Sequence, residues 1–106
     1  MEARKLDAFQ VIADPSRRQM LHMLTRQSMH INQLADNFEM SRPAVSKHVK
    51  VMQQAGFISI ETVGRQRYCH LNKEGFRTLH EFINYFEDFW NTKLKNLDRL
   101  LNQKNK

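Results

Sequence analysis

Apolar residues recur at three- and four-residue intervals in several stretches of the chain, a pattern that predicts amphipathic helices. The first stretch is short and runs from Leu6 to Val11. The second follows Asp14-Pro15, where the aspartate can cap a helix and a proline at the first helical position loses no hydrogen bond. We expect this second helix to end near Gln27, with apolar positions at Met20, Leu21, Met23 and Leu24.

Two shorter helices are expected between residues 31 and 55, after an extended segment from Met29 to Ile31. Asn32 is the expected N-cap of the first helix, whose inward positions are Leu34, Ala35 and Phe38. Ser41 is the expected N-cap of the second, which carries Pro43 in its first turn and runs to about Ala55. Two short helices joined by a tight turn predict a helix-turn-helix.

The pattern then changes from helical to extended. Gly56 is expected to end the preceding helix, because the residue after a C-cap often needs a positive φ. Residues 57–63 and 67–71 are rich in strand-forming residues, and Gly64-Arg65-Gln66 joins them as a turn. This hairpin, about 57–71, is the expected wing. The predicted fold is therefore mostly α with a small β-hairpin, a winged helix-turn-helix in the order helix, helix, short strand, helix, helix, hairpin, long helix, which occupies residues 1–106 as one domain.

A long helix, about residues 73–101, is expected to follow Asn72. Its apolar positions continue far past the wing, where a domain this small has little core left to offer. Residues near Phe76 and Leu79 are expected to pack on their own chain, and the rest would leave an aromatic stripe in water. We therefore predict a homodimer whose interface includes Leu6, Phe9, Phe82, Phe86, Phe89, Trp90 and Leu97.

Charge adds a location to this picture. The formal net charge is +6 and the isoelectric point is near 9.8. Between Met40 and Lys73 six Lys or Arg residues stand against one acid, Glu61. Such a basic segment is typical of proteins that bind nucleic acid. The single cysteine, the absence of an apolar run near 20 residues and the polar N-terminus lead us to expect a cytoplasmic protein with no membrane partner.

The second helix of the predicted motif has two different faces. At 100° per residue, Val45, Val49 and Met52 fall within about 60° of each other and form a core stripe. The predicted DNA-contacting face of this helix and its cap comprises Ser41, Arg42, Pro43, Ser46, Lys47 and Lys50. Arg and Lys can bind guanine edges or phosphates, and a helix N-terminus favours phosphate. The alternative is an ordinary solvated face.

The predicted hairpin places Arg65, Gln66 and Arg67 at its tip, beside Tyr68. A cationic tip can follow the DNA backbone or enter a narrow minor groove. By itself it could equally be a polar turn, but its position directly after the basic helix favours DNA binding.

Three segments resemble the arsenical-resistance-repressor (ArsR/SmtB-type) family of bacterial winged-helix regulators. They are ADPSRRQMLHML, INQLADNFEMSRPAVSKHVKVMQQAGFIS and GRQRYCHL, within a match from about Phe9 to Leu71. The resemblance implies a dimeric DNA-binding repressor, often released by an inducer, in which Ser41, Arg42, Ser46 and Lys47 face the DNA groove. His48 lies within the matching segment. We expect its side chain to pack or to bond to the backbone, and the alternative is a contact with a DNA phosphate.

The resemblance also raises metal sensing, for which the chain lacks the expected residues. Where many relatives carry a C-x-C pair, this chain has His30 and Asn32. A second family site uses Asp, His, His and Glu on paired final helices. Here His80 has Thr78 instead of an Asp two residues before it, and Asn91 instead of a His eleven residues after it. We expect Cys69 to be a small core residue and predict neither a metal nor another cofactor.

An enzyme is not expected. The sequence has no phosphate-binding glycine loop and no H-E-x-x-H or G-x-S-x-G motif. Ser46 and His48 lie two residues apart on one helix and therefore point about 200° apart, which prevents a nucleophile–base pair. We predict a sequence-specific regulator, a repressor bound to a pseudo-palindromic operator in double-stranded DNA. The alternatives are a metal-responsive sensor of the same family and a winged-helix module that docks on protein or RNA.

Overall fold

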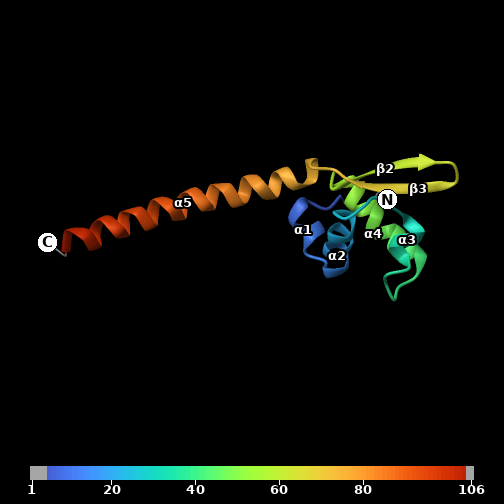
Figure 1. Ribbon diagram of the computed structural model, residues 1–106, viewed down its shortest axis with the longest axis horizontal. Coiled ribbons are helices and arrows are strands. Elements are labelled where there is room, and N and C mark those ends of the chain that lie inside the picture. Colours follow the sequence, from blue (N-terminus) through green and yellow to red (C-terminus); the bar gives the residue numbers. More distant parts are fainter. Residues whose placement is uncertain (1–4, 105–106) are drawn as a thin grey trace.

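One long helix projects from a small body of helices and strands, on the side opposite the wing (Figure 1). The computed structural model describes residues 5–104, so residues 1–4 and 105–106 of the predicted domain lie outside the described part. The largest dimension is 72 Å, against 34 and 25 Å in the other directions. The elements in order are α1 (Ala8–Ile12), α2 (Pro15–Leu24), β1 (Met29–His30), α3 (Ile31–Ala35), α4 (Arg42–Gln54), β2 (Ile58–Val63), β3 (Gln66–Leu71) and α5 (Glu74–Lys104). This order confirms the predicted winged helix-turn-helix fold.

The helix starts follow capping chemistry, with one error in the prediction. The Asp14 carboxylate accepts from Arg17 N–H at the start of α2, and Ser41 Oγ accepts from Ala44 N–H at the start of α4, as predicted. Asn32 is not the cap of α3. His30 takes that place: its Nδ1 accepts from Gln33 N–H at 3.3 Å, while the Gln33 side chain accepts from His30 N–H at 3.0 Å. This reciprocal pair is a capping box built on a histidine.

The short strand predicted before α3 joins the predicted hairpin in one sheet. β1 pairs with β3 through Met29 opposite Cys69 and His30 opposite Tyr68, which gives the antiparallel order β1-β3-β2. Val63 pairs with Gln66, so the hairpin turn consists of Gly64 and Arg65 rather than the three residues expected. Gly64 has a φ of 62°, a conformation suited to glycine in a two-residue turn.

The core lies where α1 to α4 meet the sheet. α4 turns Val45, Val49 and Met52 into it, as predicted from the angles along the helix, and all three are at most 2 % exposed. Leu34 and Ala35 of α3 are buried, and Phe38, which lies beyond the end of α3, packs against the core while half-buried. Burial of one face of α4 therefore determines which of its residues face solvent.

A close approach of two backbones anchors the first turn of α5. Gly75 N–H donates to the Gly56 carbonyl at 2.7 Å, and Gly56 has the positive φ, 83°, predicted for the end of α4. The rings of Phe57 and Phe76 pack edge to face with centroids 4.8 Å apart. Phe76 and Leu79 are half-buried against the core, which confirms that the start of the last helix packs on its own chain. Within residues 5–104, no helix is both long and apolar enough to cross a membrane.

Replacing Gly75 with alanine tests this anchor. A Cβ at this position would lie 2.7 Å from Cγ and from the backbone nitrogen of Phe57. Glycine-to-alanine changes normally favour a helix, but here overpacking should lower the free energy of unfolding by about 1–3 kcal/mol. Urea unfolding measures the change, with Thr78→Ala on the exposed side of the same helix as the control. A Gly75→Ala protein as stable as the unchanged chain would contradict the close approach.

Candidate nucleic-acid interface

The outer face of α4 presents the residues expected to contact DNA. All six predicted positions on this helix and its cap are exposed: Ser41, Arg42, Pro43, Ser46, Lys47 and Lys50. The Ser41 hydroxyl accepts a backbone hydrogen bond at 3.2 Å, and its own O–H remains available to donate. The first turn of α4 contains no acidic residue. Neither its basic side chains nor the partial positive charge of the helix N-terminus is therefore neutralised by a neighbour in that turn.

The wing tip lies beside α4 and continues this surface. Arg65, Gln66 and Arg67 are exposed, and together with Ser46, Asn32 and Ile31 they line a groove of about 240 Å³. The groove joins α3, α4 and the wing. The structure therefore brings Ser46 together with the three predicted wing residues. Arg42, on the first turn of α4, and Lys50, farther along the helix, do not line the groove.

Asn32 is a residue of this surface that the sequence did not identify. Its amide was assigned to capping α3, but His30 performs that role, so the exposed Asn32 side chain is free of the cap and lines the groove. The signal was present as Gln33, three residues after His30, at the position of a capping-box partner. Tyr68, expected near the wing tip, instead packs edge to face on His30 at 5.6 Å and is half-buried.

A chain of hydrogen bonds braces the base of the wing. His70 Nδ1 lies 2.5 Å from Ser28 Oγ, and His70 Nε2 lies 3.2 Å from Glu61 Oε1. The order serine, histidine, carboxylate is that of a hydrolase triad. The side chains of His70 and Glu61 are 37 % and 64 % exposed, however, so the water-excluded setting that strengthens such a site is missing. We assign the three residues to holding β2, β3 and the loop before β1 together.

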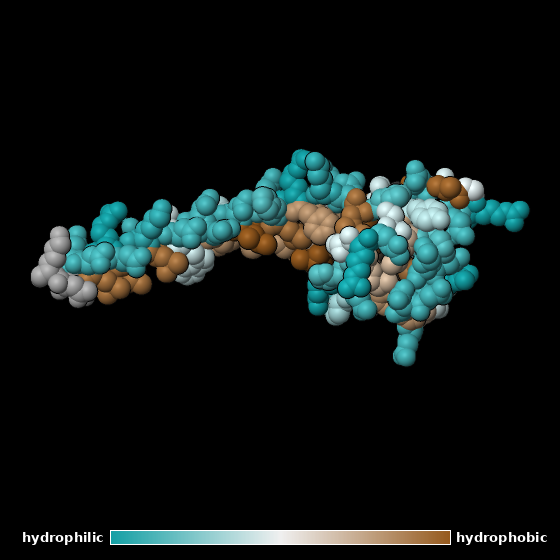
Figure 2. Space-filling model, viewed as in Figure 1, coloured by the Kyte–Doolittle hydropathy of each residue, from teal (hydrophilic) through white to brown (hydrophobic). Residues whose placement is uncertain are grey.

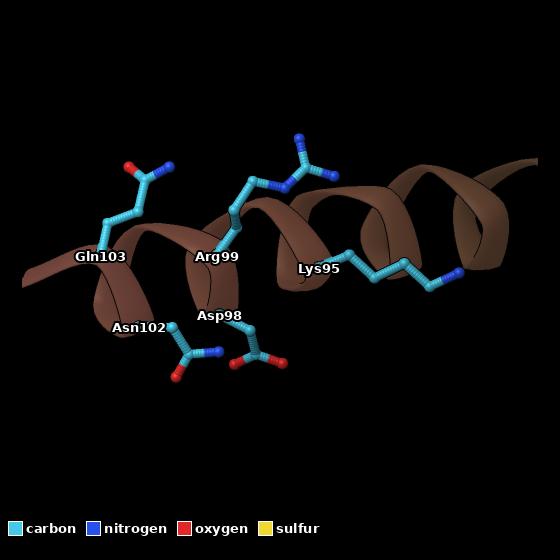
Figure 3. Close-up of a pocket in the computed structure, with 5 residues that line it drawn as sticks. All are labelled: Lys95, Asp98, Arg99, Asn102 and Gln103. Carbon is cyan, nitrogen blue, oxygen red and sulfur yellow. The ribbon is translucent and has the colours of Figure 1, made fainter. Parts of the chain in front are cut away.

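One side of α5 is apolar along the length of the helix (Figure 2). From Phe82 onwards its large apolar residues are all at least 42 % exposed, and Trp90 reaches 58 %. The polar residues lie on the other side: Figure 3 shows Lys95, Asp98, Arg99, Asn102 and Gln103 projecting from the end of the helix. The stripe is thus an unpartnered surface of one helix.

At the body of the molecule, this stripe meets α1 and a groove. Phe9, 40 % exposed, packs edge to face on Phe82 of the same chain at 5.0 Å, and Leu6 packs against the core. The adjoining groove has a volume of about 270 Å³ and includes Ile12, Leu21, Phe76 and Leu79 in its lining. Apolar side chains of α1 and α2 therefore adjoin the start of the α5 stripe.

Comparison with known proteins agrees with this arrangement. The sequence model of the bacterial regulatory protein arsR family matches residues 14–59. The chain is 33 % identical over 85 residues to the transcriptional repressor SdpR of Bacillus subtilis (strain 168), covering 80 % of this chain and 91 % of that one. It is 30 % identical over 94 residues to the HTH-type transcriptional regulator Rv2034 of Mycobacterium tuberculosis, covering 89 % and 85 % respectively.

Solved structures share the fold. The crystal structure of the ArsR family transcriptional regulator RHA00566 superposes with a TM-score of 0.73 at 32 % identity, covering 79 % of this chain and 87 % of that one. The homodimeric winged helix-turn-helix DNA-binding domain Mb0332 of Mycobacterium bovis superposes with a TM-score of 0.61 at 17 % identity, covering 76 % and 75 %. The second likeness shows the fold; the family model, the two relatives and RHA00566 confirm the family expected from the three matching segments.

Cys69 is a core residue, as predicted. It is 0 % exposed on β3, and burial raises the pKa of its thiol to about 11, against the opposing effect of the Arg67 charge. Among residues 5–104, no three His, Cys, Asp or Glu side chains are grouped closely enough to hold a metal ion. His30, at one position of the family's C-x-C pair, uses its Nδ1 to cap α3.

The buried thiol should be unreactive in the folded chain. A pKa near 11 instead of the ordinary 9.0 lowers the thiolate fraction about a hundredfold, and only the thiolate is the nucleophile. We expect a disulfide reagent such as dithionitrobenzoate at pH 8 to modify Cys69 only as fast as the fold opens, and to modify it at once in guanidinium. Rapid stoichiometric modification of the folded chain would place the thiol at the surface.

Proposed function

Because the chain belongs to the ArsR family of bacterial regulatory proteins and is a DNA-binding transcriptional regulator, we propose that it represses transcription in the bacterial cytoplasm as a homodimer on a pseudo-palindromic operator. The observation that carries this proposal is the groove that joins Ser46 of α4 to Arg65, Gln66 and Arg67 of the wing. It makes the recognition helix and the wing one continuous surface, which is rich in donors and contains no acidic lining residue.

In the proposed complex, α4 lies in the major groove with its N-terminal turns closest to the bases. Arg42 and Lys47 are the candidates for guanine edges, and Ser46 can donate to or accept from a base. Ser41 and the N-terminal N–H groups of α4 face a phosphate, which the helix dipole favours. Lys50 lies one turn farther along the same face and would contact the backbone.

The wing groove would hold the DNA backbone beside the major groove. Its cations, Arg65 and Arg67, present planar guanidinium groups that suit phosphate oxygens. Asn32 and Gln66 add neutral donors. A double-stranded RNA partner fits this surface poorly, because the deep, narrow major groove of an A-form helix does not admit α4.

The proposed dimer forms through the apolar stripe of α5. Apolar residues of the stripe recur at a spacing of 11 along the helix: Leu79, Trp90 and Leu101; Ile83 and Leu94; Phe86 and Leu97; Phe89 and Leu100. An 11-residue repeat is close to the natural period of a helix, so the stripe stays on one side of a nearly straight helix about 46 Å long. Two such helices can bury the stripe and present the two copies of α4 about 34 Å apart, one turn of DNA.

Selection of binding sites from genomic DNA by the purified full chain tests the proposal as a whole. We expect paired, inverted half-sites whose centres are separated by about one helical turn, about 10 base pairs. Placement of a recovered site across a promoter should lower transcription in a reporter assay in the presence of the protein. Recovery of no common sequence, or of single half-sites alone, would contradict the proposal. Activation from the recovered site would contradict repression only.

The recognition helix can be tested by removing its two base-contact candidates. Arg42→Ala or Lys47→Ala should reduce the preference for the selected site over unrelated DNA by about 1–3 kcal/mol, the usual contribution of a specific base contact. Fluorescence anisotropy against both DNAs measures the ratio. Lys95→Ala removes the same charge from α5, far from the proposed interface, and should leave the ratio unchanged. An Arg42/Lys47 double variant with full specificity would remove α4 from recognition.

The α5 stripe can be tested by placing a charge in it. Phe86→Lys should weaken the dimer about a hundredfold or more, because each copy loses the burial of a phenylalanine, about 1.5–3 kcal/mol, and gains a charge in the interface. Thr92→Lys makes the same change of charge on the opposite side of α5 and should remain a dimer. Analytical ultracentrifugation compares the two. A folded, dimeric Phe86→Lys chain would place the interface elsewhere.

A further inference from the structure

Two neighbouring arginines of α2 satisfy the end of α1. The last carbonyls of a helix lack intrahelical partners, and α1 has only five residues. Arg17 Nε donates to the Val11 carbonyl at 2.8 Å and Arg17 Nη2 to the Gln10 carbonyl at 3.0 Å. Arg18 Nη1 donates to the carbonyls of Ile12 and Ala13 at 2.7 and 3.1 Å. These hydrogen bonds fix the end of α1 to α2.

The guanidinium of Arg17 also reaches the recognition helix. Its Nη1 lies 3.3 Å from Nδ1 of His48 on α4, in a part-buried position. Arginine can only donate, so Nδ1 of His48 is the acceptor in this contact. Arg17 also acts on Asp14: burial alone would raise the pKa of its carboxyl, but the hydrogen bond from the Arg17 N–H and the nearby charge of Arg17 lower it.

On its other side, α1 contacts the proposed dimer helix. Phe9 of α1 packs on Phe82 of α5 with ring centroids 5.0 Å apart. A series of direct contacts thus leads from α5 through α1 and Arg17 to His48. Its two ends are the helix proposed to join two copies of the chain and the helix proposed to bind DNA.

We infer that Arg17 and His48 form a positioning link, which sets the angle of α4 relative to α1 and α5 and thereby the separation of the two recognition helices in the dimer. The inference rests on the proposed function and adds a role for His48, which the sequence left open between packing and a phosphate contact. Because the Nδ1 atom is directed to Arg17, the inference assigns His48 a positioning role through that residue rather than a base contact.

Two substitutions of His48 separate the hydrogen bond from other effects. His48→Asn keeps an acceptor close to the position of Nδ1, whereas His48→Leu fills similar space without an acceptor. Leucine is the better helix former of the two. A role limited to the stability of α4 therefore predicts that His48→Leu is the less damaging change, and the positioning link predicts the opposite.

The test repeats the site selection with a DNA pool in which the distance between half-sites varies. The unchanged chain and His48→Asn should select one spacing. His48→Leu should select the same half-site sequence with a wider range of spacings, and should bind the original spacing about tenfold more weakly, the usual effect of losing a hydrogen bond to a charged group. Affinity for a single half-site should stay within about a factor of two.

Other outcomes overturn the link. A changed half-site sequence in His48→Leu would make His48 a base contact, and an equal loss on every DNA with a shallower salt dependence would make it a phosphate contact. Identical selection by all three proteins would show that the hydrogen bond has no effect on spacing. If the unchanged chain selects no paired half-sites, the proposed dimeric function itself fails, and with it any role of Arg17 in spacing.

Discussion

The surface proposed to bind DNA depends on the burial of one face of α4. Val45, Val49 and Met52 enter the core, and their combined apolar burial is the largest favourable contribution that this helix can make. Once that face is fixed, helical geometry leaves Ser46, Lys47 and Lys50 no position except the solvent side. The same core holds β3 through Cys69, and with it the wing. The core therefore orients α4 and the wing together, although none of its own residues is proposed to contact DNA.

A second constraint lies at the start of α5. The Gly75–Gly56 hydrogen bond and the Phe57–Phe76 contact fix the direction in which the helix leaves the body, so its later turns extend into solvent. A monomer leaves the stripe from Phe82 to Leu101 largely exposed, an arrangement that is unfavourable in water. Fold stability and assembly are thus linked through one helix, whose first turns serve the monomer and whose later turns serve the proposed dimer.

Local signals in the sequence were sufficient for the elements and most of their ends. Asp14 with Pro15, Ser41 with Pro43 and the glycine after α4 each act within one helical turn, so capping chemistry located them correctly. The cap of α3 was misplaced because histidine is not among the usual N-cap residues, and Asn32 lies only two positions later. The short strand β1 was expected, but its pairing with β3, some forty residues away, was not, because a two-residue strand carries no pattern that identifies its partner. The groove with Asn32 and the Arg17–His48 contact likewise join residues far apart in sequence, which periodicity cannot detect.

The distribution of charge and apolar surface gives the two ends of the molecule different tasks. The cations of α4 and the wing lie at one end, and the apolar stripe of α5 leaves from the other (Figures 1 and 2). Repulsion between two cationic surfaces is weak when they are separated by more than a Debye length, about 8 Å at physiological salt. Two copies joined through α5 would hold their cationic ends well beyond that distance, so the charge that favours DNA does not oppose assembly. The two ends are coupled through the angle of α4 relative to α5, and α1 lies between these two helices. A five-residue helix has no stability of its own, so α1 takes its position from Arg17, Arg18 and Phe82 and can relate one helix to the other.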